Sequence, residues 1–220
     1  MLLELIDIHK SYKIHGRKTE ILSGISFSAE KGEMIAIMGE SGAGKSTLLN
    51  IAGGILRADS GKLIYDSDEI NIASKKELDL YRREHIGFIV QDFALISDRD
   101  VEENIAIPLR IRKINRSQRS IIISQALMEV GLKGEEKTYP CMMSGGEQQR
   151  VAIARALATD PDIILADEPT GSLDSENADN VLNLLRMVCE KGKTVIIVTH
   201  DKEVASRCNR IVKIERRRRD

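Results

Sequence analysis

Residues 39–46 read GESGAGKS, with two glycines, a lysine and a hydroxyl at the offsets G-x-x-x-x-G-K-[ST]. This spacing is typical of a phosphate-binding loop between a strand and a helix, and here the apolar run MIAIM precedes it and KSTLLNIA follows it. Glycines let the backbone approach phosphate oxygens, and the loop amides and the helix start attract the anion. The pattern predicts a nucleotide site; the alternative is a glycine turn that only opens a helix.

Three side chains of this segment receive specific roles. Lys45 is expected to reach the β- and γ-phosphates as a mobile point charge. Ser46 is expected to bind Mg²⁺ through its hydroxyl, and Thr47 to bond the α-phosphate. The other nucleotide-binding residues expected in the loop are Gly39, Ser41, Gly42 and Gly44.

Two adjacent carboxylates, Asp167 and Glu168, end the apolar run IILA. At a strand end near Ser46, Asp167 could bind Mg²⁺ through its water shell. Glu168 points in a different direction and could polarise an attacking water. The pair could instead mark only a strand-to-turn transition closed by Pro169, but with the phosphate loop present we favour nucleotide hydrolysis.

A third segment, CMMSGGEQQR at 141–150, contains no obvious arrangement of catalytic or metal-binding groups. Ser144, Gly145 and Gly146 precede a run of good helix formers. A serine cap, bare amides and the positive end of a helix dipole together form an anion site. The alternative is a simple N-cap, which needs the serine but not two glycines.

The composition admits one α/β domain and argues against other classes. The chain has 220 residues, of which 42% are hydrophobic and only 3% aromatic, so aliphatic side chains must build the core. The net charge of −1 gives no global field that would attract nucleic acid. The three scattered cysteines indicate neither a disulfide framework nor a zinc site. The N-terminus is typical of a strand rather than a signal peptide, and no apolar run is long enough to span a bilayer.

Short apolar strands alternate with amphipathic helices, which predicts a mostly parallel sheet with helices on its faces. From about residue 92 to 158 the pattern is almost purely helical, which predicts an inserted helical subdomain. The expected strands are Leu2–Ile8, Ile21–Ser28, Met34–Met38, Lys62–Tyr65, Ile86–Val90, Ile163–Ala166, Thr194–Val198 and Ile211–Ile214. The expected helices are Lys45–Ala52, Lys75–Glu84, Val101–Arg110, Ser117–Val130, Glu147–Ala158 and Glu176–Lys191.

With GESGAGKS, CMMSGGEQQR and ILADEPTGSLD in this order, the chain resembles the nucleotide-binding subunits of ATP-binding cassette (ABC) transporters over nearly its whole length. The resemblance implies an α/β fold: a P-loop NTPase (RecA-like) core with an antiparallel β subdomain and an inserted α-helical subdomain. It implies a single nucleotide-binding domain over residues 1–220, with the core in 1–91 and 159–220. ATP and Mg²⁺ are the implied cofactors, and ATP hydrolysis to ADP and phosphate is the implied reaction.

The resemblance gives roles to residues whose own pattern would indicate only packing or a strand edge. Tyr12 would stack on adenine, and Gln91 would sense Mg²⁺ and the attacking water. His200 would contact the γ-phosphate and orient Glu168, and the loop 172–174 would cross to an opposite subunit. The expected catalytic residues are thus Glu168, His200, Gln91 and Lys45, and the expected metal ligands are Ser46, Gln91 and Asp167.

In this family the segment Ser144–Gly146 binds the nucleotide of a second subunit. Two chains would therefore meet head-to-tail as a homodimer that sandwiches two ATP molecules, and ATP-driven closure would drive a separate integral membrane permease. The chain would lie in the cytoplasm, peripheral on the inner face of the cell membrane through that permease. No nucleic-acid partner is expected.

Details within the motifs favour an exporter. Glu147 follows the two glycines, TGSLD follows DEP, and the segment 91–109 resembles LolD-like, MacB-like and bacitracin-export-type subunits. Those serve lipoprotein release, macrolide export and antimicrobial-peptide export or sensing. Phe93, Leu95 and Ile96 could line a groove for a helix of the permease, or they could simply pack in the core.

Some positions depart from the family pattern. Met143 replaces a usual leucine at little expected cost, and Asp100 stands where threonine is common. The C-terminus IVKIERRRRD lacks the usual Asp-Gly turn and final strand. The run Arg216–Arg219 is expected to be a solvated tail, with contact to anionic lipid or RNA as the alternative.

The strongest rival function is a soluble ABC ATPase that acts on DNA or ribosomes. Such proteins usually carry long insertions, zinc modules or two cassettes, which this sequence lacks. A P-loop GTPase would need an N-K-x-D tetrad, which is absent, and a non-catalytic regulator would lack a base at the position of Glu168. The sequence names neither the transported substrate nor the permease.

Overall fold

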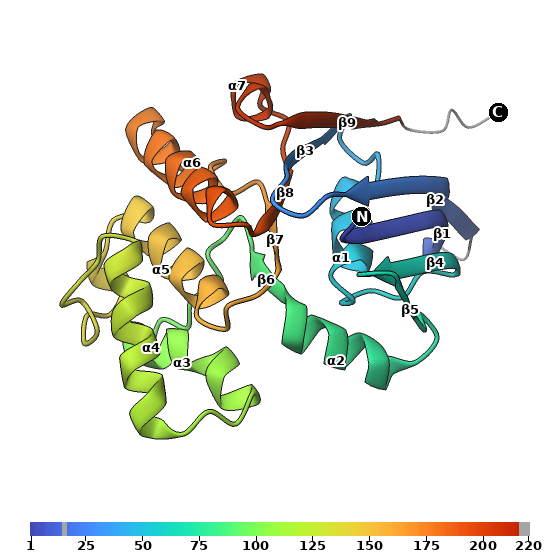
Figure 1. Ribbon diagram of the computed structural model, residues 1–220. Coiled ribbons are helices and arrows are strands. Elements are labelled where there is room, and N and C mark those ends of the chain that lie inside the picture. The colour runs from blue at the N-terminus through green and yellow to red at the C-terminus, as the bar shows by residue number, and fades with distance from the viewer. Residues whose placement is uncertain (15–16, 216–220) are drawn as a thin grey trace.

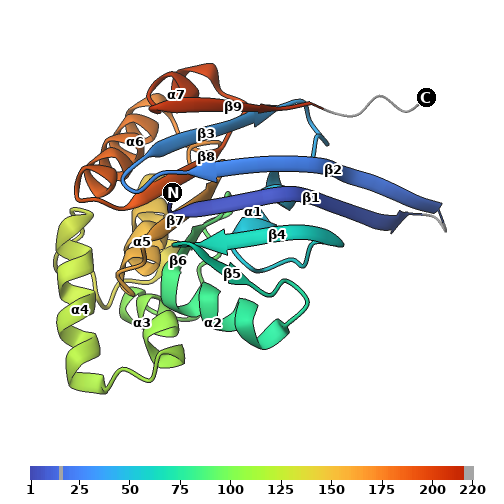
Figure 2. The same ribbon diagram turned by 45° about the vertical axis from the view of Figure 1, so that its right-hand side comes forward.

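A computed structural model describes residues 1–14 and 17–215, which form two sheets and the helices that cover them (Figures 1 and 2). The antiparallel sheet has the order β2-β1-β4-β5, and the parallel sheet has the order β6-β7-β8-β3-β9. The strands are β1 (Leu3–Ile14), β2 (Arg17–Ala29), β3 (Met34–Gly39), β4 (Ser60–Tyr65), β5 (Asp68–Ile70), β6 (Ile86–Ile89), β7 (Ile163–Asp167), β8 (Thr194–Val198) and β9 (Arg210–Ile214). The helices are α1 (Lys45–Ala52), α2 (Lys75–His85), α3 (Val101–Ile111), α4 (Arg116–Glu129), the 3₁₀ turn η1 (Pro140–Met142), α5 (Gly145–Leu157), α6 (Ser175–Glu190) and α7 (Lys202–Ser206).

The predicted fold class is confirmed, and the differences lie at the ends and in short elements. The sequence pattern missed β5, η1 and α7, which are short and carry few buried side chains. It also ended β1 six residues early, at Ile8. Register shifts between Leu5 and Ser11 interrupt the alternation of buried and exposed side chains, but they do not end the pairing with β2.

Two apolar cores lie on the two faces of the parallel sheet. Side chains of β1, β2 and α1 pack on one face, so α1 lies between the two sheets (Figure 1). Helices α5 and α6 pack on the other face, and α3 and α4 pack on α5 to extend the same core. Strands β7 and β8 contribute fully buried side chains to both cores, which explains why their sequences are continuously apolar.

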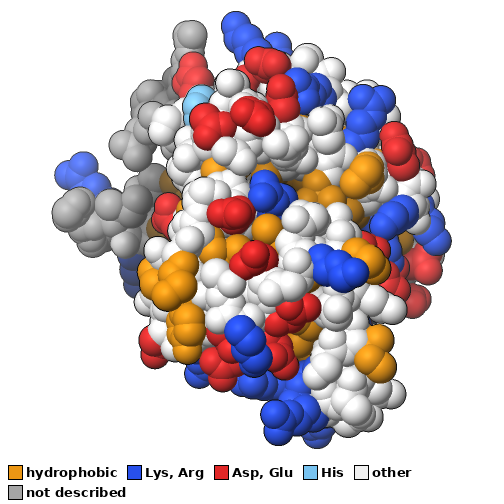
Figure 3. Space-filling model, turned by 90° about the vertical axis from the view of Figure 1, so that its left-hand side faces the viewer, with side chains coloured by type: hydrophobic (Ala, Val, Ile, Leu, Met, Phe, Trp, Pro, Cys, Tyr) orange, Lys and Arg blue, Asp and Glu red, His pale blue; other side chains and the backbone are white. Residues whose placement is uncertain are grey.

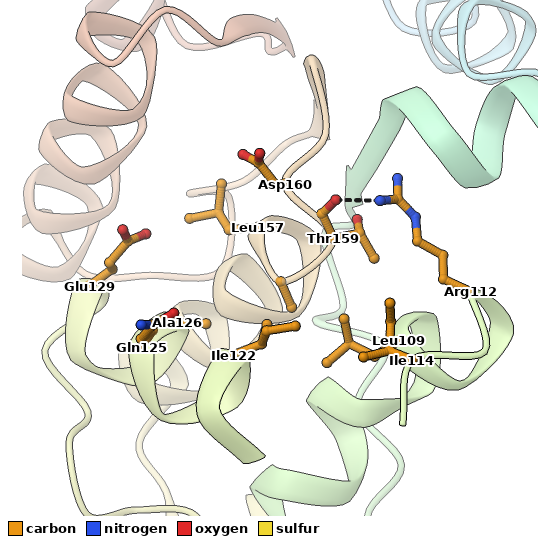
Figure 4. A pocket seen from close by; sticks show the side chains of 11 residues that line it. Leu109, Arg112, Ile114, Ile122, Gln125, Ala126, Glu129, Leu157, Thr159 and Asp160 are labelled. Carbon is orange, nitrogen blue, oxygen red and sulfur yellow. Dashed lines mark hydrogen bonds between the residues drawn. The ribbon is translucent and has the colours of Figure 1, made fainter. Parts of the chain in front are cut away.

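The described elements between residues 92 and 158 are all helical, and one arginine fastens them to the sheet region. Arg112, just after α3, donates to the carbonyl oxygens of Arg83 (2.8 Å), Glu84 (2.5 Å) and Thr159 (2.6 Å). Figure 4 shows the last of these bonds beside a cavity of about 350 Å³ between α3, α4 and the end of α5. A single side chain thus joins the end of α3 to the end of α2 and to the segment that follows α5.

The face formed by the helical region carries charges of both signs. Figure 3 shows Lys and Arg interspersed with Asp and Glu over this side of the molecule, with no continuous basic stripe. In the part of the chain that the structure describes, no helix combines the length and the apolar character needed to cross a bilayer. The run Arg216–Arg219 lies outside the described residues, so its expected role stays a prediction.

Candidate functional site

The phosphate-binding loop lies between β3 and α1, as its spacing predicts. Gly42 and Gly44 have positive φ angles (76° and 92°), a region that glycine enters without strain. A Cβ at Gly44 would lie 2.6 Å from Leu22 Cδ2, so the antiparallel sheet closes directly on the end of the loop. Lys45 Nζ donates to the carbonyl oxygens of Gly39 (2.9 Å) and Glu40 (3.1 Å), which places its charge inside the loop.

Ser46 and Asp167 meet at the carboxyl ends of β3 and β7. The Ser46 hydroxyl donates to the Asp167 carboxylate, and Lys45 lies close enough to act on it electrostatically. Burial raises the pKa of Asp167, and the Ser46 hydrogen bond opposes that shift only in part. The carboxylate is therefore short of positive partners, which is the environment that a bound divalent cation would relieve.

Glu168 has a strained backbone and a well-oriented side chain. Its φ is 46°, in the left-handed region, and its amide donates to Val198 O at 2.9 Å. Its Oε1 lies 2.8 Å from His200 Nδ1, and Thr199 Oγ1 donates to its Oε2 at 3.3 Å. The hydrogen bond and the charge of Glu168 raise the pKa of His200, so the imidazolium form is favoured beside this carboxylate. The ends of β7 and β8 thus bring Glu168, the predicted base, into contact with the histidine that is predicted to orient it.

Gln91 follows β6 and approaches the same place from the other side. A Cβ at Gly171 would lie 3.6 Å from both Gln91 Nε2 and Glu168 Cβ, so Gly171 lies between these two candidate catalytic residues. The structure therefore brings together Lys45, Ser46, Asp167, Glu168, His200 and Gln91 around the carboxyl ends of the parallel strands.

Two side chains that the sequence pattern does not single out form hydrogen bonds with the segment after Gln91. Arg155 of α5 donates to the carbonyl oxygens of Phe93 (2.8 Å) and Ala94 (2.5 Å), two residues with positive φ. Asn104 of α3 is fully buried, and its amide exchanges four hydrogen bonds with the segment 96–100. Both residues lie within helical patterns, so no local signal distinguishes them from ordinary helix positions.

The structure also places three residues of the segment 93–100 that the sequence singled out. Asp100 is the N-cap of α3 and accepts from the Glu103 amide at 2.8 Å, so a capping carboxylate stands where threonine is common. The D-x-x-E spacing would have predicted this cap. Leu95 packs against the helical core, whereas Ile96 is 37% exposed. Leu95 thus follows the packing alternative, Ile96 does not, and a groove lined by Phe93, Leu95 and Ile96 stays a prediction.

Ser144 begins α5 with a reciprocal capping box. Its hydroxyl accepts from the Glu147 amide (3.3 Å) and donates to Glu147 Oε2 (2.7 Å), while its own amide donates to Glu147 Oε2 (2.8 Å). These bonds lower the pKa of Glu147. Ser144 and Gly145 are exposed, whereas Gly146 is buried against Asn177 of α6. A Cβ at Gly145 would meet nothing closer than 3.7 Å, so packing within this chain explains only the second glycine.

Two further predictions concern Tyr12 and the segment 172–174. Tyr12 lies within β1 rather than after it; the residue is 37% exposed, and the centroid of its ring lies 5.7 Å from Lys10 Nζ. In the segment 172–174, Asp174 caps α6 because its side chain accepts from the main-chain amide of Asn177 at 2.9 Å. Adenine stacking by Tyr12 and crossing of this segment to another subunit both stay predictions.

The fold and the site together define a nucleoside triphosphatase with a phosphate-binding loop. The model of the ABC transporter family matches residues 22–171. The chain therefore belongs to the ABC transporter family, and the expected class, an ATP-hydrolysing cassette, is confirmed at this level.

One curated relative is MacB of Escherichia coli strain K12, a macrolide export ATP-binding/permease protein, which is 43% identical over 97% of this chain. The chain spans about a third (33%) of that relative's length. A dimeric structure of MJ0796, a bacterial ABC transporter cassette, is 38% identical with a TM-score of 0.88, over 97% of this chain and 94% of that chain. A post-hydrolysis dimer of the same cassette, bound to ADP and Pi, is 37% identical with a TM-score of 0.89, over 99% and 97% of the two chains.

Proposed function

We propose that this chain is the ATP-hydrolysing subunit of a MacB-like membrane exporter and works as a head-to-tail homodimer. The observation that carries the proposal is the meeting of Lys45, Asp167, Glu168 and His200 at the carboxyl ends of β3, β7 and β8. The relation to MacB supports the exporter branch, because the identity extends over 97% of this chain.

In the proposed reaction, Glu168 accepts a proton from the water that attacks the γ-phosphorus. His200 and Thr199 each occupy one oxygen of the Glu168 carboxylate, so the carboxylate plane is oriented before substrate arrives. Lys45 would exchange its two hydrogen bonds to loop carbonyl oxygens for hydrogen bonds to phosphate oxygens. Both kinds of oxygen accept from an ammonium group, and the phosphate oxygens carry the larger negative charge. The leaving group is ADP, and the P–O bond to its β-phosphate breaks as the bond to water forms.

The residues present fit a Mg²⁺ ion. A hydroxyl and a half-buried carboxylate already in contact, Ser46 and Asp167, supply the hard oxygen donors that Mg²⁺ prefers. We propose that these two residues and Gln91 hold the ion, which when bound would neutralise charge on the phosphate oxygens. Burial raises the pKa of Asp167, and the positive charge of a bound ion would offset that effect by favouring the ionised carboxylate.

The proposed composite site uses the N-terminus of α5. Ser144 and Gly145 are exposed, and the helix begins there with its amides and its positive dipole end turned outward. In the proposed dimer these groups close on the γ-phosphate carried by Lys45 of the other copy. MJ0796 has been solved as a dimer at 38% identity, which supports the same assembly here.

We further propose that the permease docks between α2 and α3. A groove of about 810 Å³ opens there, with exposed Leu80 (49%) and Ile111 (59%) on its walls. Lys75 and Lys76 stand at the start of α2 on its rim. Apolar walls with a basic rim suit a short amphipathic helix that carries acidic side chains.

Assembly and hydrolysis can be tested together. Ser144→Arg should abolish ATP hydrolysis while single chains still bind nucleotide, because the large cation blocks only the composite half of the site. Ser120→Arg, the same change at an exposed serine of α4, is the matched control and should behave as wild type. If a dilute and strictly monomeric preparation hydrolyses ATP at the full rate, the composite site is wrong.

Docking can be tested by crosslinking in source-cell membranes. A Leu80→Cys chain should crosslink to a protein with transmembrane helices, whereas Ile121→Cys, 60% exposed on α4, should not. Charge reversal at Lys75 and Lys76 should weaken the crosslink. Equal crosslinking from both cysteines would contradict docking in this groove.

A further inference from the structure

Gln149 of α5 is fully buried and only half satisfied. Its Nε2 donates to Pro169 O at 2.6 Å, and its Oε1 has no hydrogen-bond partner among the described residues. The orientation of the amide is unambiguous, because the reverse orientation would place two carbonyl oxygens together. An unpaired buried acceptor costs about 1–3 kcal/mol, so glutamine is a poor choice here if stability alone matters.

The bond to Pro169 acts on the turn that carries the base. Pro169 directly follows Glu168 and, as a proline, offers only its carbonyl for main-chain hydrogen bonding. From the β8 side, the turn is restrained by Val198 O and by the Thr199 and His200 side chains. From the α5 side, Gln149 donates the one side-chain hydrogen bond to it that the described residues provide.

The same face of α5 packs along the next element. Gly146, three residues earlier, lies against Asn177 of α6, so both contacts join α5 to the segment that runs from Glu168 into α6. Because Ser144 and Gly145 begin the same rigid helix, a shift of that end must displace Pro169 as well.

We propose that Gln149 is a positioning residue that makes the orientation of Glu168 depend on the position of α5 relative to the strand ends. This inference rests on the proposed function, in which Glu168 is the base and the start of α5 meets the nucleotide of a second copy. Gln149 touches neither nucleotide nor water; it acts on Glu168 through Pro169.

The decisive variant is Gln149→Met, which keeps the volume, removes the donor and also removes the unpaired acceptor. The change exchanges one unpaired acceptor, Gln149 Oε1, for another, Pro169 O, so the folded chain should be about as stable as wild type. KM for ATP should stay within about twofold while kcat falls about tenfold to a hundredfold, the size of a misplaced catalytic group. Gln125→Met, an exposed position on α4, is the matched control and should leave all three quantities unchanged.

A second measurement separates positioning from assembly. In the Glu168→Gln background, adding Gln149→Met should leave the ATP-dependent dimer intact by size-exclusion chromatography. Loss of that dimer, a kcat within twofold of wild type, or a parallel loss of stability and of nucleotide binding would each overturn the positioning role. If Gln149→Met does not fold, Gln149→Leu is measured in the same way. Full turnover by Glu168→Gln alone would instead refute the proposed function, whatever Gln149 does.

Discussion

Two adjacent glycines at the start of α5 should respond differently to the same added methyl group: Gly146→Ala should destabilise the fold, whereas Gly145→Ala should not. In Gly146→Ala the new Cβ would overlap the Asn177 amide and lie 3.0 Å from Asn177 Cβ. Rotation of the amide can relieve the first clash but not the second, because the Cβ is placed by the backbone. In Gly145→Ala the nearest atoms, in Leu173 and Phe93, would be 3.7 and 3.8 Å away, an ordinary contact.

The magnitudes follow from these distances. Overpacking costs about 1–3 kcal/mol, and contact with both the amide and the fixed Cβ of Asn177 puts this case in the upper part of that range, at about 2–3 kcal/mol. Alanine recovers about 1 kcal/mol of helix propensity, so Gly146→Ala should lose about 1–2 kcal/mol of unfolding free energy. For a chain of this size that lowers Tm by roughly 2–8 °C. Gly145→Ala should stay within about 0.5 kcal/mol of wild type. Neither glycine has a positive φ, so backbone strain does not enter the comparison.

Denaturant unfolding of both variants, without nucleotide, measures this difference. ATPase assays then give the complementary result: Gly145→Ala should lose at least about tenfold in turnover although its fold and its nucleotide binding as a single chain are intact. Asn177→Ala keeps the Cβ that causes the lasting clash and should leave most of the cost of Gly146→Ala in place, whereas Asn177→Gly should reduce that cost, with a coupling energy of about 0.5–2 kcal/mol. Equal destabilisation by the two alanines would refute the assignment of Gly146 to packing and Gly145 to an external contact.

Three further predictions concern the catalytic loops. Glu168→Gln should bind ATP normally, stop turnover and accumulate an ATP-bound dimer, as seen by size-exclusion chromatography; hydrolysis near the wild-type rate would remove Glu168 from the role of base. The pKa of His200, followed by NMR, should lie above 6.5 and fall towards 6.5 in Glu168→Gln, because the Glu168 carboxylate raises it. The free energy of folding that this contact contributes is present below pH 6.5 and is lost as pH rises through the folded-state pKa of His200. Arg155→Met should speed hydrogen exchange at residues 92–96, because Phe93 and Ala94 lose the donor that stabilises their left-handed backbone, whereas unchanged exchange would contradict that contact.

The sequence predicted the parts of the site that depend on local spacing. The loop at 39–46 and the carboxylates Asp167 and Glu168 are recognisable because each chemical role needs a residue type at a set offset from a strand end. The same holds for the Ser144 cap, where Glu147 three residues later completes the capping box. The roles of Gln91 and His200 came from resemblance, since one polar residue after an apolar strand has no distinctive pattern.

The sequence could not show which carbonyl each buried polar side chain faces. Gln149, Asn104 and Arg155 occur among good helix formers, and their partners lie 20, 4 to 8, and 61 to 62 residues away. Those pairings exist only after α3 and α5 pack beside the strand ends. β5 escaped prediction for a different reason: Asp-Glu-Ile is polar and short, and only pairing with β4 makes it a strand.

These contacts give α5 an unusual position among the helices. It begins at Ser144 and Gly145, bonds Pro169 next to Glu168 through Gln149, and bonds Phe93 near Gln91 through Arg155. Two segments that carry predicted catalytic residues and follow different strands are therefore bonded to one helix, whose exposed end is the proposed contact with the second copy. A displacement of that end cannot change one segment alone, because the helix transmits it to both. Hydrolysis would then require α5 to occupy its position against both segments. That requirement would couple the chemistry of each site to closure of the dimer rather than to nucleotide binding by a single chain.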